Sequence, residues 1–223
     1  MIPIKVKKNR FSRGETYYLP SRYEEITLDQ YLVVKHHAES VGDLIAFLSK
    51  CPHKLDGEAF APVLSWLTEP LDIKNFEPDP LLFDLKRKTY GQKLVACDAL
   101  RKDPTMFGVA AVVDVYFPGQ KSSRQPLGVT LPRYLAIVEQ LEKILRVEQG
   151  NLRTEPTPEQ LRAGISEFDK LGNFNQIDDL AMQLRMTYDD VLALEYIVVY
   201  QKLLKNKISS NFEKRYRAII KQT

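Results

Sequence analysis

Residues 164–220 decide the fold, and they read GISEFDKLGNFNQIDDLAMQLRMTYDDVLALEYIVVYQKLLKNKISSNFEKRYRAII. Apolar residues recur through this stretch at intervals of three and four, the spacing that places them on one face of a helix. Part of it has the outline of a helix-turn-helix, and its end is basic and carries aromatic residues. We therefore expect the last third of the chain to be helical and to finish in a long C-terminal helix.

Length and composition are typical of a globular protein. The 223 residues are 44% hydrophobic and 27% charged, which suits one core or two small ones. The net charge of +3 is too small to indicate nucleic-acid binding by the whole chain. Two cysteines, Cys51 and Cys97, cannot build a disulfide framework, and the opening MIPIKVKK lacks the apolar run of a signal peptide. We expect reduced thiols, a cytoplasmic location and no membrane-spanning segment.

The N-terminal third is predicted to combine a small β-hairpin with helices. Ile2, Ile4 and Val6 alternate with other residues, and Gly14 precedes a second short β-type run at 16–19, which indicates two strands around a turn. The capping box Thr27-Leu28-Asp29-Gln30 predicts a helix that ends near residue 39. Further helices are expected over residues 43–50 and 57–67.

The rest of the chain reads as helices separated by proline-rich joints. Residues 68–84 hold three prolines and mark an internal boundary. Helices are expected over residues 106–117 and 131–151, the second with Thr130 as its cap and Pro132 in its first turn. The predicted fold class is mainly α, a multi-helix orthogonal bundle with a small N-terminal β-hairpin and a long C-terminal helix.

Three segments follow from these boundaries. Residues 1–73 hold the hairpin and the first helices, residues 74–155 form a central helical region, and residues 156–223 hold a helical hairpin and a basic terminal helix. The last segment can form one compact unit with the central region. The T-x-x-Q pattern recurs at Thr27, Thr89 and Thr157, and we interpret these matches as independent helix caps rather than as an internal duplication.

No constellation for catalysis, a cofactor or a metal is visible. Cys51-Pro52-His53 forms the main Cys/His cluster, with His36 and His37 upstream. These residues do not have the spacing that a four-ligand zinc site needs. Pairs of carboxylates occur at helix starts, where they complement the helix dipole. The chain has no phosphate-binding glycine loop and no nucleophile elbow. We expect no enzymatic activity.

Residues 177–192 have the apolar frame of a DNA-binding helix-turn-helix. Ala181 and Val191 stand ten residues apart, as in that motif. The usual turn glycine is Arg185, however, and Asp189 and Asp190 lie where the recognition helix would meet phosphates. A DNA-binding role is kept as an alternative, and a helical hairpin that does not bind nucleic acid is preferred.

The basic segment after residue 200 is the candidate partner-binding surface. Leu204, Ile208, Phe212 and Tyr216 follow one another at steps of four, which predicts an apolar stripe on a helix. The rim of this stripe is basic, with Lys205, Arg215 and Arg217. Ser210 followed by Glu213 would allow the helix to restart after a bend near 209–211. The alternative to a partner-binding helix is a terminal helix docked on the core of the same chain.

Two parts of the sequence resemble tail assembly chaperones of tailed bacteriophages and prophages. The first is Leu19-Pro20-Ser21-Arg22-Tyr23-Glu24-Glu25-Ile26-Thr27-Leu28-Asp29-Gln30-Tyr31. The second is the series Asp179-Leu180-Ala181, Asp189-Asp190-Val191-Leu192, Glu195-Tyr196 and Phe212-Glu213-Lys214-Arg215-Tyr216. Together they cover about residues 15–40 and 160–221.

The resemblance implies binding without catalysis. Such a protein would bind the long helical tape-measure protein or the tail tube proteins during morphogenesis, in the cytoplasm of the host cell. It can also form a homo-oligomer. The first alternative is a virion structural protein, such as a head–tail connector or tail adaptor, located in the particle. The second is a helix-turn-helix DNA-binding protein.

Overall fold

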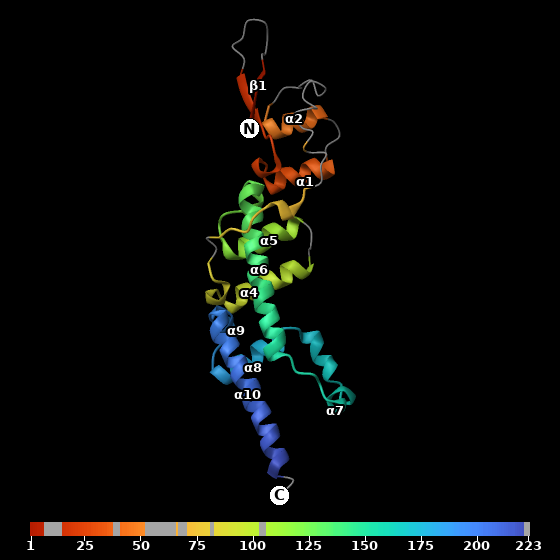
Figure 1. Ribbon diagram of the computed structural model, residues 1–223, viewed down its shortest axis with the longest axis vertical. Helices are drawn as coiled ribbons and strands as arrows, with labels where there is room; N and C mark the ends of the chain where they lie inside the picture. Colours follow the sequence, from red (N-terminus) through yellow and green to blue (C-terminus); the bar gives the residue numbers. More distant parts are fainter. Residues whose placement is uncertain are drawn as a thin grey trace. The chain divides into compact units, whose positions relative to one another are not determined.

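The computed structural model describes residues 1–6, 15–37, 41–51, 66, 71–80, 83–102 and 106–220. Helices make up most of these residues, with a small hairpin near the N-terminus and a long helix at the C-terminus (Figure 1). The predicted mainly α, multi-helix fold is therefore confirmed.

The chain divides into two compact units. Unit 1 comprises residues 1–82 and 99–137, and unit 2 comprises residues 83–98 and 138–223. The predicted segment 1–73 lies wholly in unit 1 and the predicted segment 156–223 wholly in unit 2. The predicted central segment 74–155 is divided between them, because helices α4 (Tyr90–Lys102) and α6 (Leu127–Leu152) each contribute residues to both units.

Unit 1 begins with the predicted hairpin. Strands β1 (Ile2–Val6) and β2 (Glu15–Leu19) pair antiparallel, with Ile2 opposite Leu19. Its described helices are the short 3₁₀ helix η1 (Tyr23–Glu25), α1 (Leu28–His37), α2 (Val41–Ser49), the 3₁₀ helix η3 (Ile73–Asn75), α5 (Met106–Tyr116), the 3₁₀ helix η5 (Ser122–Arg124), the first part of α6 and the end of α4. The helix predicted over 57–67 lies outside the described residues, except for Trp66.

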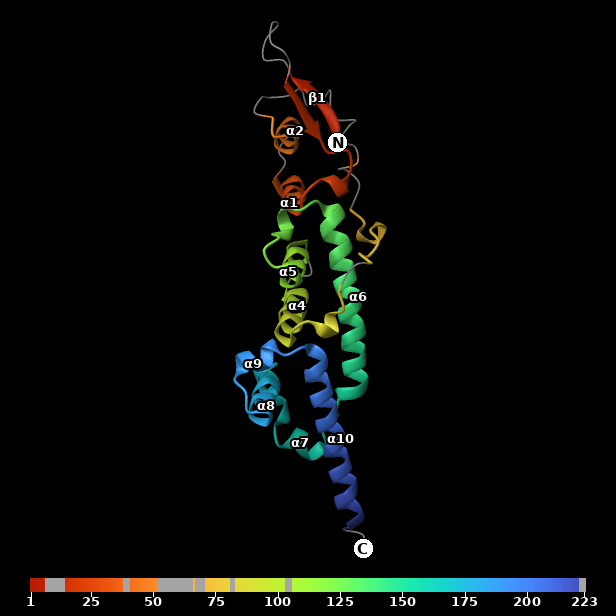
Figure 2. The same cartoon turned by 90° about the vertical axis from the view of Figure 1, so that its left-hand side faces the viewer.

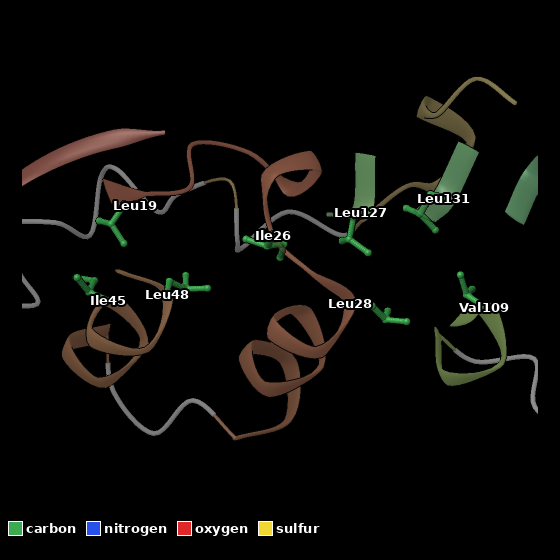
Figure 3. Close-up of a cluster of buried hydrophobic side chains, with 8 residues drawn as sticks. All are labelled: Leu19, Ile26, Leu28, Ile45, Leu48, Val109, Leu127 and Leu131. Atoms are coloured by element: carbon green, nitrogen blue, oxygen red, sulfur yellow. The ribbon is translucent and has the colours of Figure 1, made fainter. Parts of the chain in front are cut away.

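The core of unit 1 joins the hairpin to four helices. Figure 3 shows side chains from β2, α1, α2, α5 and α6 turned toward a common interior. The cluster consists of Leu19, Ile26, Leu28, Ile45, Leu48, Val109, Leu127 and Leu131. An isolated hairpin is marginally stable in water, so burial of Leu19 in this cluster is what holds the two strands in place.

Helix α6 begins four residues before the predicted start, at Leu127. The backbone N–H of Leu127 donates to the Ile26 carbonyl oxygen at 2.7 Å, so a contact with a distant segment sets the first turn. Thr130 is therefore not the cap. Its side chain is fully buried inside the helix, and its Oγ1 donates to the Ser122 carbonyl at 3.1 Å. Pro132 likewise lies within the helix rather than in its first turn.

The starts of α1 and α6 form a matched pair. Thr27, one residue before α1, makes an isolated antiparallel bridge with Pro126, one residue before α6. Leu28 and Leu127, the first residues of the two helices, are buried beside the bridge. The capping box of Thr27 is formed in full, because the Gln30 N–H donates to Thr27 Oγ1 at 3.1 Å and the Thr27 N–H donates to Gln30 Oε1 at 2.9 Å.

The same arrangement occurs in unit 2. Thr89, one residue before α4, bridges to Glu195, one residue before α10 (Tyr196–Ile220). The Tyr196 N–H donates to the Lys88 carbonyl at 2.8 Å, as the Leu127 N–H does to that of Ile26. The Thr27 and Thr89 boxes thus occupy equivalent places. The Thr157 box opens the short helix α7 (Pro158–Arg162), and the interpretation of the three boxes as independent caps stays a prediction.

Unit 2 has helices and no strand among its described residues. After the 3₁₀ helix η4 (Leu85–Arg87), α4 and the end of α6 come α7, the 3₁₀ helix η6 (Ile165–Leu171), α8 (Phe174–Leu184), α9 (Tyr188–Ala193) and α10. Figure 2 shows α8 and α9 packed beside the first half of α10, whose second half continues past them. No bend occurs at residues 209–211, since α10 is one continuous helix.

Candidate functional site

The first turn of α10 is fixed deep in unit 2. Tyr196 and Val199 are buried, and the ring of Tyr196 lies 5.6 Å from the ammonium group of Lys93 on α4. That ammonium group also contacts both carboxylate oxygens of Glu148 on α6, at 3.0 and 2.8 Å. Because Lys93 is only 8% exposed, this ion pair is a buried one.

The buried cluster around Lys93 has the chemistry of a structural site. Burial, and the nearby carboxylate of Glu148, raise the pKa of both Tyr90 and Tyr196 above the ordinary value for tyrosine. Both phenols therefore stay neutral, and the Tyr90 hydroxyl donates to Gln176 Oε1 at 2.6 Å. A neutral phenol beside a fully paired lysine offers neither a base nor a nucleophile. The cluster holds α10 to α4 and α6.

The middle of α10 is joined to other parts of unit 2 by side-chain hydrogen bonds. Tyr200 accepts a hydrogen bond from Asn151 at 2.7 Å, and the Asn206 amide donates to Gln183 at 2.7 Å. Lys207 Nζ donates to the Arg153 carbonyl at 2.7 Å. All described side chains of the helix from Ile208 to Ile220 are exposed.

The predicted apolar stripe lies mainly on this exposed end. Leu204 is half-buried, at the edge of the packed part. Ile208, Phe212 and Tyr216 are 59%, 60% and 54% exposed. The rings of Phe212 and Tyr216 stack with their centroids 5.9 Å apart and their planes 9° from parallel. The alternative was a terminal helix docked on the core of the same chain. This end of α10 is exposed instead.

The stripe winds around the helix. Each step of four residues turns about 40° beyond a full circle, because an α-helix has 3.6 residues per turn. Such a row is the i±4n ridge that packs into the grooves of a second helix crossing at about −50°. The exposed end of α10 is therefore shaped for a crossing helix over two or three turns, rather than for a long parallel coiled coil.

The predicted basic rim is exposed as well. Lys205, Arg215 and Arg217 are all at the surface. Arg217 lies 3.5 Å from Glu213 one turn earlier, and the Arg215 Nε donates to the Asn211 carbonyl at 3.3 Å. Solvent-exposed pairs of this kind contribute little to stability. The rim is thus a positive border around the apolar stripe.

The predicted helical hairpin is present and consists of α8 and α9. Arg185 takes the left-handed turn position, with φ of 56°, where the DNA-binding motif normally has glycine. Helix α9 has six residues, and Thr187 caps its start. Thr187 Oγ1 accepts from the Asp190 N–H at 3.2 Å, and Asp190 Oδ2 accepts from the Thr187 N–H at 3.2 Å. A negative, fully engaged N-terminus is poorly suited to phosphate.

Sequence reasoning missed a second exposed apolar surface, between residues 161 and 188. The predicted hairpin with acidic caps lies in this region, yet many large apolar side chains here face solvent, among them Leu161, Phe168, Leu171, Phe174, Met182, Met186 and Tyr188. Helix α8 buries only Leu180 and Ala181. The sequence of this region has more apolar residues than one buried helix face can hold, and this excess could have indicated an exposed apolar surface.

Other kinds of site have little support within the described part of the chain. No group of three or more His, Cys, Asp or Glu side chains there could hold a metal ion, and the Pro52-His53 part of the Cys51 cluster lies outside it. None of the described helices has the length and apolar character needed to cross a bilayer. Comparison with protein families, curated proteins and solved structures gives no match to the chain.

Proposed function

We propose that this protein is a non-catalytic assembly factor that holds a helical client protein on the exposed end of α10. The observation that carries the proposal is the row of Ile208, Phe212 and Tyr216, each more than half exposed, on a helix whose other end is buried. Large exposed apolar patches with polar rims mark protein interaction sites in soluble proteins.

The rim defines the chemistry of the client. Lys205, Arg215 and Arg217 border the stripe with positive charge. A matching client is an amphipathic helix with an apolar ridge flanked by Asp or Glu, laid across α10. The resemblance to phage tail assembly chaperones suggests that this client is the long helical tape-measure protein, or a tail tube protein, kept from aggregating before the tail polymerises.

Binding of this kind is expected to be reversible. Full burial of a large apolar side chain contributes about 1.5–3 kcal/mol, and ordering of side chains and loss of free motion oppose association. A contact over two or three turns is therefore weak by itself. Many copies along one long client would hold it firmly and still release it stepwise.

The test is co-expression with the tape-measure protein of the same phage or prophage, followed by co-purification. The double variant Ile208→Ser/Phe212→Ser should weaken the complex by about a hundredfold or more. The matched control is Leu145→Ser/Val147→Ser, which removes two exposed apolar side chains from α6 in the same unit. Circular dichroism checks that both variants keep their helices.

Equal complex formation by both double variants would refute the assignment to α10. Removal of residues 208–223 offers a second check, since Lys207 and the packed part of the helix are retained. Detection of the protein in mature virions at ring stoichiometry would instead support the connector or tail adaptor alternative.

A further inference from the structure

The region between α6 and α10 carries a charge opposite to that of the end of α10. Residues 155–195, here called the acidic arm, contain nine acidic and three basic residues, a net charge of −6. Residues 202–221 contain seven basic residues and one acidic residue, a net charge of +6. Two surfaces of one chain are thus electrostatically complementary.

The acidic arm also exposes apolar side chains suited to a second helix. Phe168, Leu171, Phe174 and Met182 are all about half exposed or more. A hollow of about 370 Å³ lies among Leu161, Ile165, Asp169 and other arm residues. An aromatic ring flanked by a positive charge would fit such a hollow, and Phe212 with Arg215 and Tyr216 with Arg217 present that combination.

The end of α10 is exposed in its own chain, since every described side chain from Ile208 to Ile220 lies at the surface. Before this end, Asn206 bonds to Gln183 of the arm and Lys207 bonds to the Arg153 carbonyl. The 13 residues from Ile208 to Ile220 add about 20 Å of continuous helix beyond that point (Figure 2). The helix would have to break to fold back.

We propose that the acidic arm of one copy binds the basic, apolar end of α10 from a second copy. The two surfaces differ, so the contact is heterologous and builds head-to-tail chains or closed rings rather than a symmetric dimer. The inference rests on the same helix end as the proposed function. Self-association would cover the apolar stripe until a client with a matching ridge displaces the neighbouring copy.

Sedimentation velocity of the full chain tests the association. Oligomers should form at about 50 mM salt and weaken at about 500 mM, because salt screens exposed charges. The arm variant Asp169→Lys/Asp179→Lys and the helix variant Lys205→Glu/Arg215→Glu should each lower the association constant about tenfold or more. The control Glu77→Lys/Glu142→Lys, with the same change in charge at two other exposed acids, should associate as the unchanged chain does.

The decisive measurement is an equimolar mixture of the arm and helix variants. Each contact in the mixture again joins opposite charges, since the lysine-bearing arm meets the glutamate-bearing helix and the unchanged arm meets the unchanged helix. Restored association supports the proposal. A monomer at low salt overturns the proposal. Association that the helix variant loses and the arm variant keeps also overturns it, because the acidic arm would then not be the partner of α10.

The client assay separates this inference from the proposed function. The arm variant should still capture the client, because its α10 is unchanged. A chain that captures the client but never self-associates keeps the proposed function and loses this inference, whereas a chain that self-associates without client binding does the reverse.

Discussion

The ion pair of Lys93 and Glu148 supports a quantitative prediction about what holds α10 in place. The two groups approach to 2.8 Å with side chains that are only 10% and 17% exposed. At that separation the Coulomb attraction is about 6 kcal/mol for an effective dielectric constant near 20, against about 1.5 kcal/mol in bulk water. Removal of both groups from water offsets most of this gain.

Truncation of one partner should therefore lower the free energy of unfolding by much more than the net contribution of the ion pair. Lys93→Met leaves the Glu148 carboxylate in a largely buried site without its cation. We expect a loss of about 3 kcal/mol in the free energy of unfolding. This is the lower end of the range for buried pairs, because Glu148 keeps some contact with water. The double variant Lys93→Met/Glu148→Leu removes both charges and should recover most of that loss.

Urea denaturation followed by circular dichroism measures these differences. The matched control is Lys143→Met, which breaks an ion pair of nearly the same length, 2.7 Å to Glu139, whose side chains are 67% and 55% exposed. We expect at most about 1 kcal/mol there. Equal losses in Lys93→Met and Lys143→Met, or a double variant as unstable as the single one, would refute the argument that burial makes the Lys93 pair important.

Two further predictions concern the helix starts. Gly128→Ala would place a Cβ 3.0 Å from the Glu24 Cβ and 3.1 Å from the Glu24 carbonyl oxygen, so we expect a loss of about 1–3 kcal/mol in the free energy of unfolding. The control Gly150→Ala, whose Cβ would have nothing within 4 Å, should gain up to about 1 kcal/mol. Equal effects of the two variants in urea denaturation would contradict close packing at the bridge. The hydroxyl and N–H of Thr187 hold the pKa of Asp190 below its ordinary value, so its contribution to folding is complete above about pH 4 and is lost as the pH falls through the lowered pKa. Thr187→Ala should raise that pKa toward the ordinary value in a carboxyl NMR titration, and an unchanged pKa would show that Thr187 is not the cause.

The sequence predicted those parts of the candidate site that depend on helical phase. The steps of four from Leu204 to Tyr216 correctly placed an apolar row on a helix, and the positive border followed from the same phase. The sequence did not show where along α10 packing stops, because burial of Tyr196 and exposure of Phe212 depend on which distant helices reach them. The exposed apolar side chains of the acidic arm were not predicted either, because their exposure also depends on which distant helices reach them.

The sequence by itself determined the local structure of this protein. Alternation over residues 2–6 specified a strand, and the capping box at Thr27 specified a helix start, because both depend only on residues a few positions apart. Tertiary structure decided that α6 starts at Leu127 and that the Thr27 and Thr89 boxes share one arrangement, since each needs a partner far away in the chain. It also decided that α10 is buried at its start and exposed at its end, which is what makes its second half a candidate binding surface.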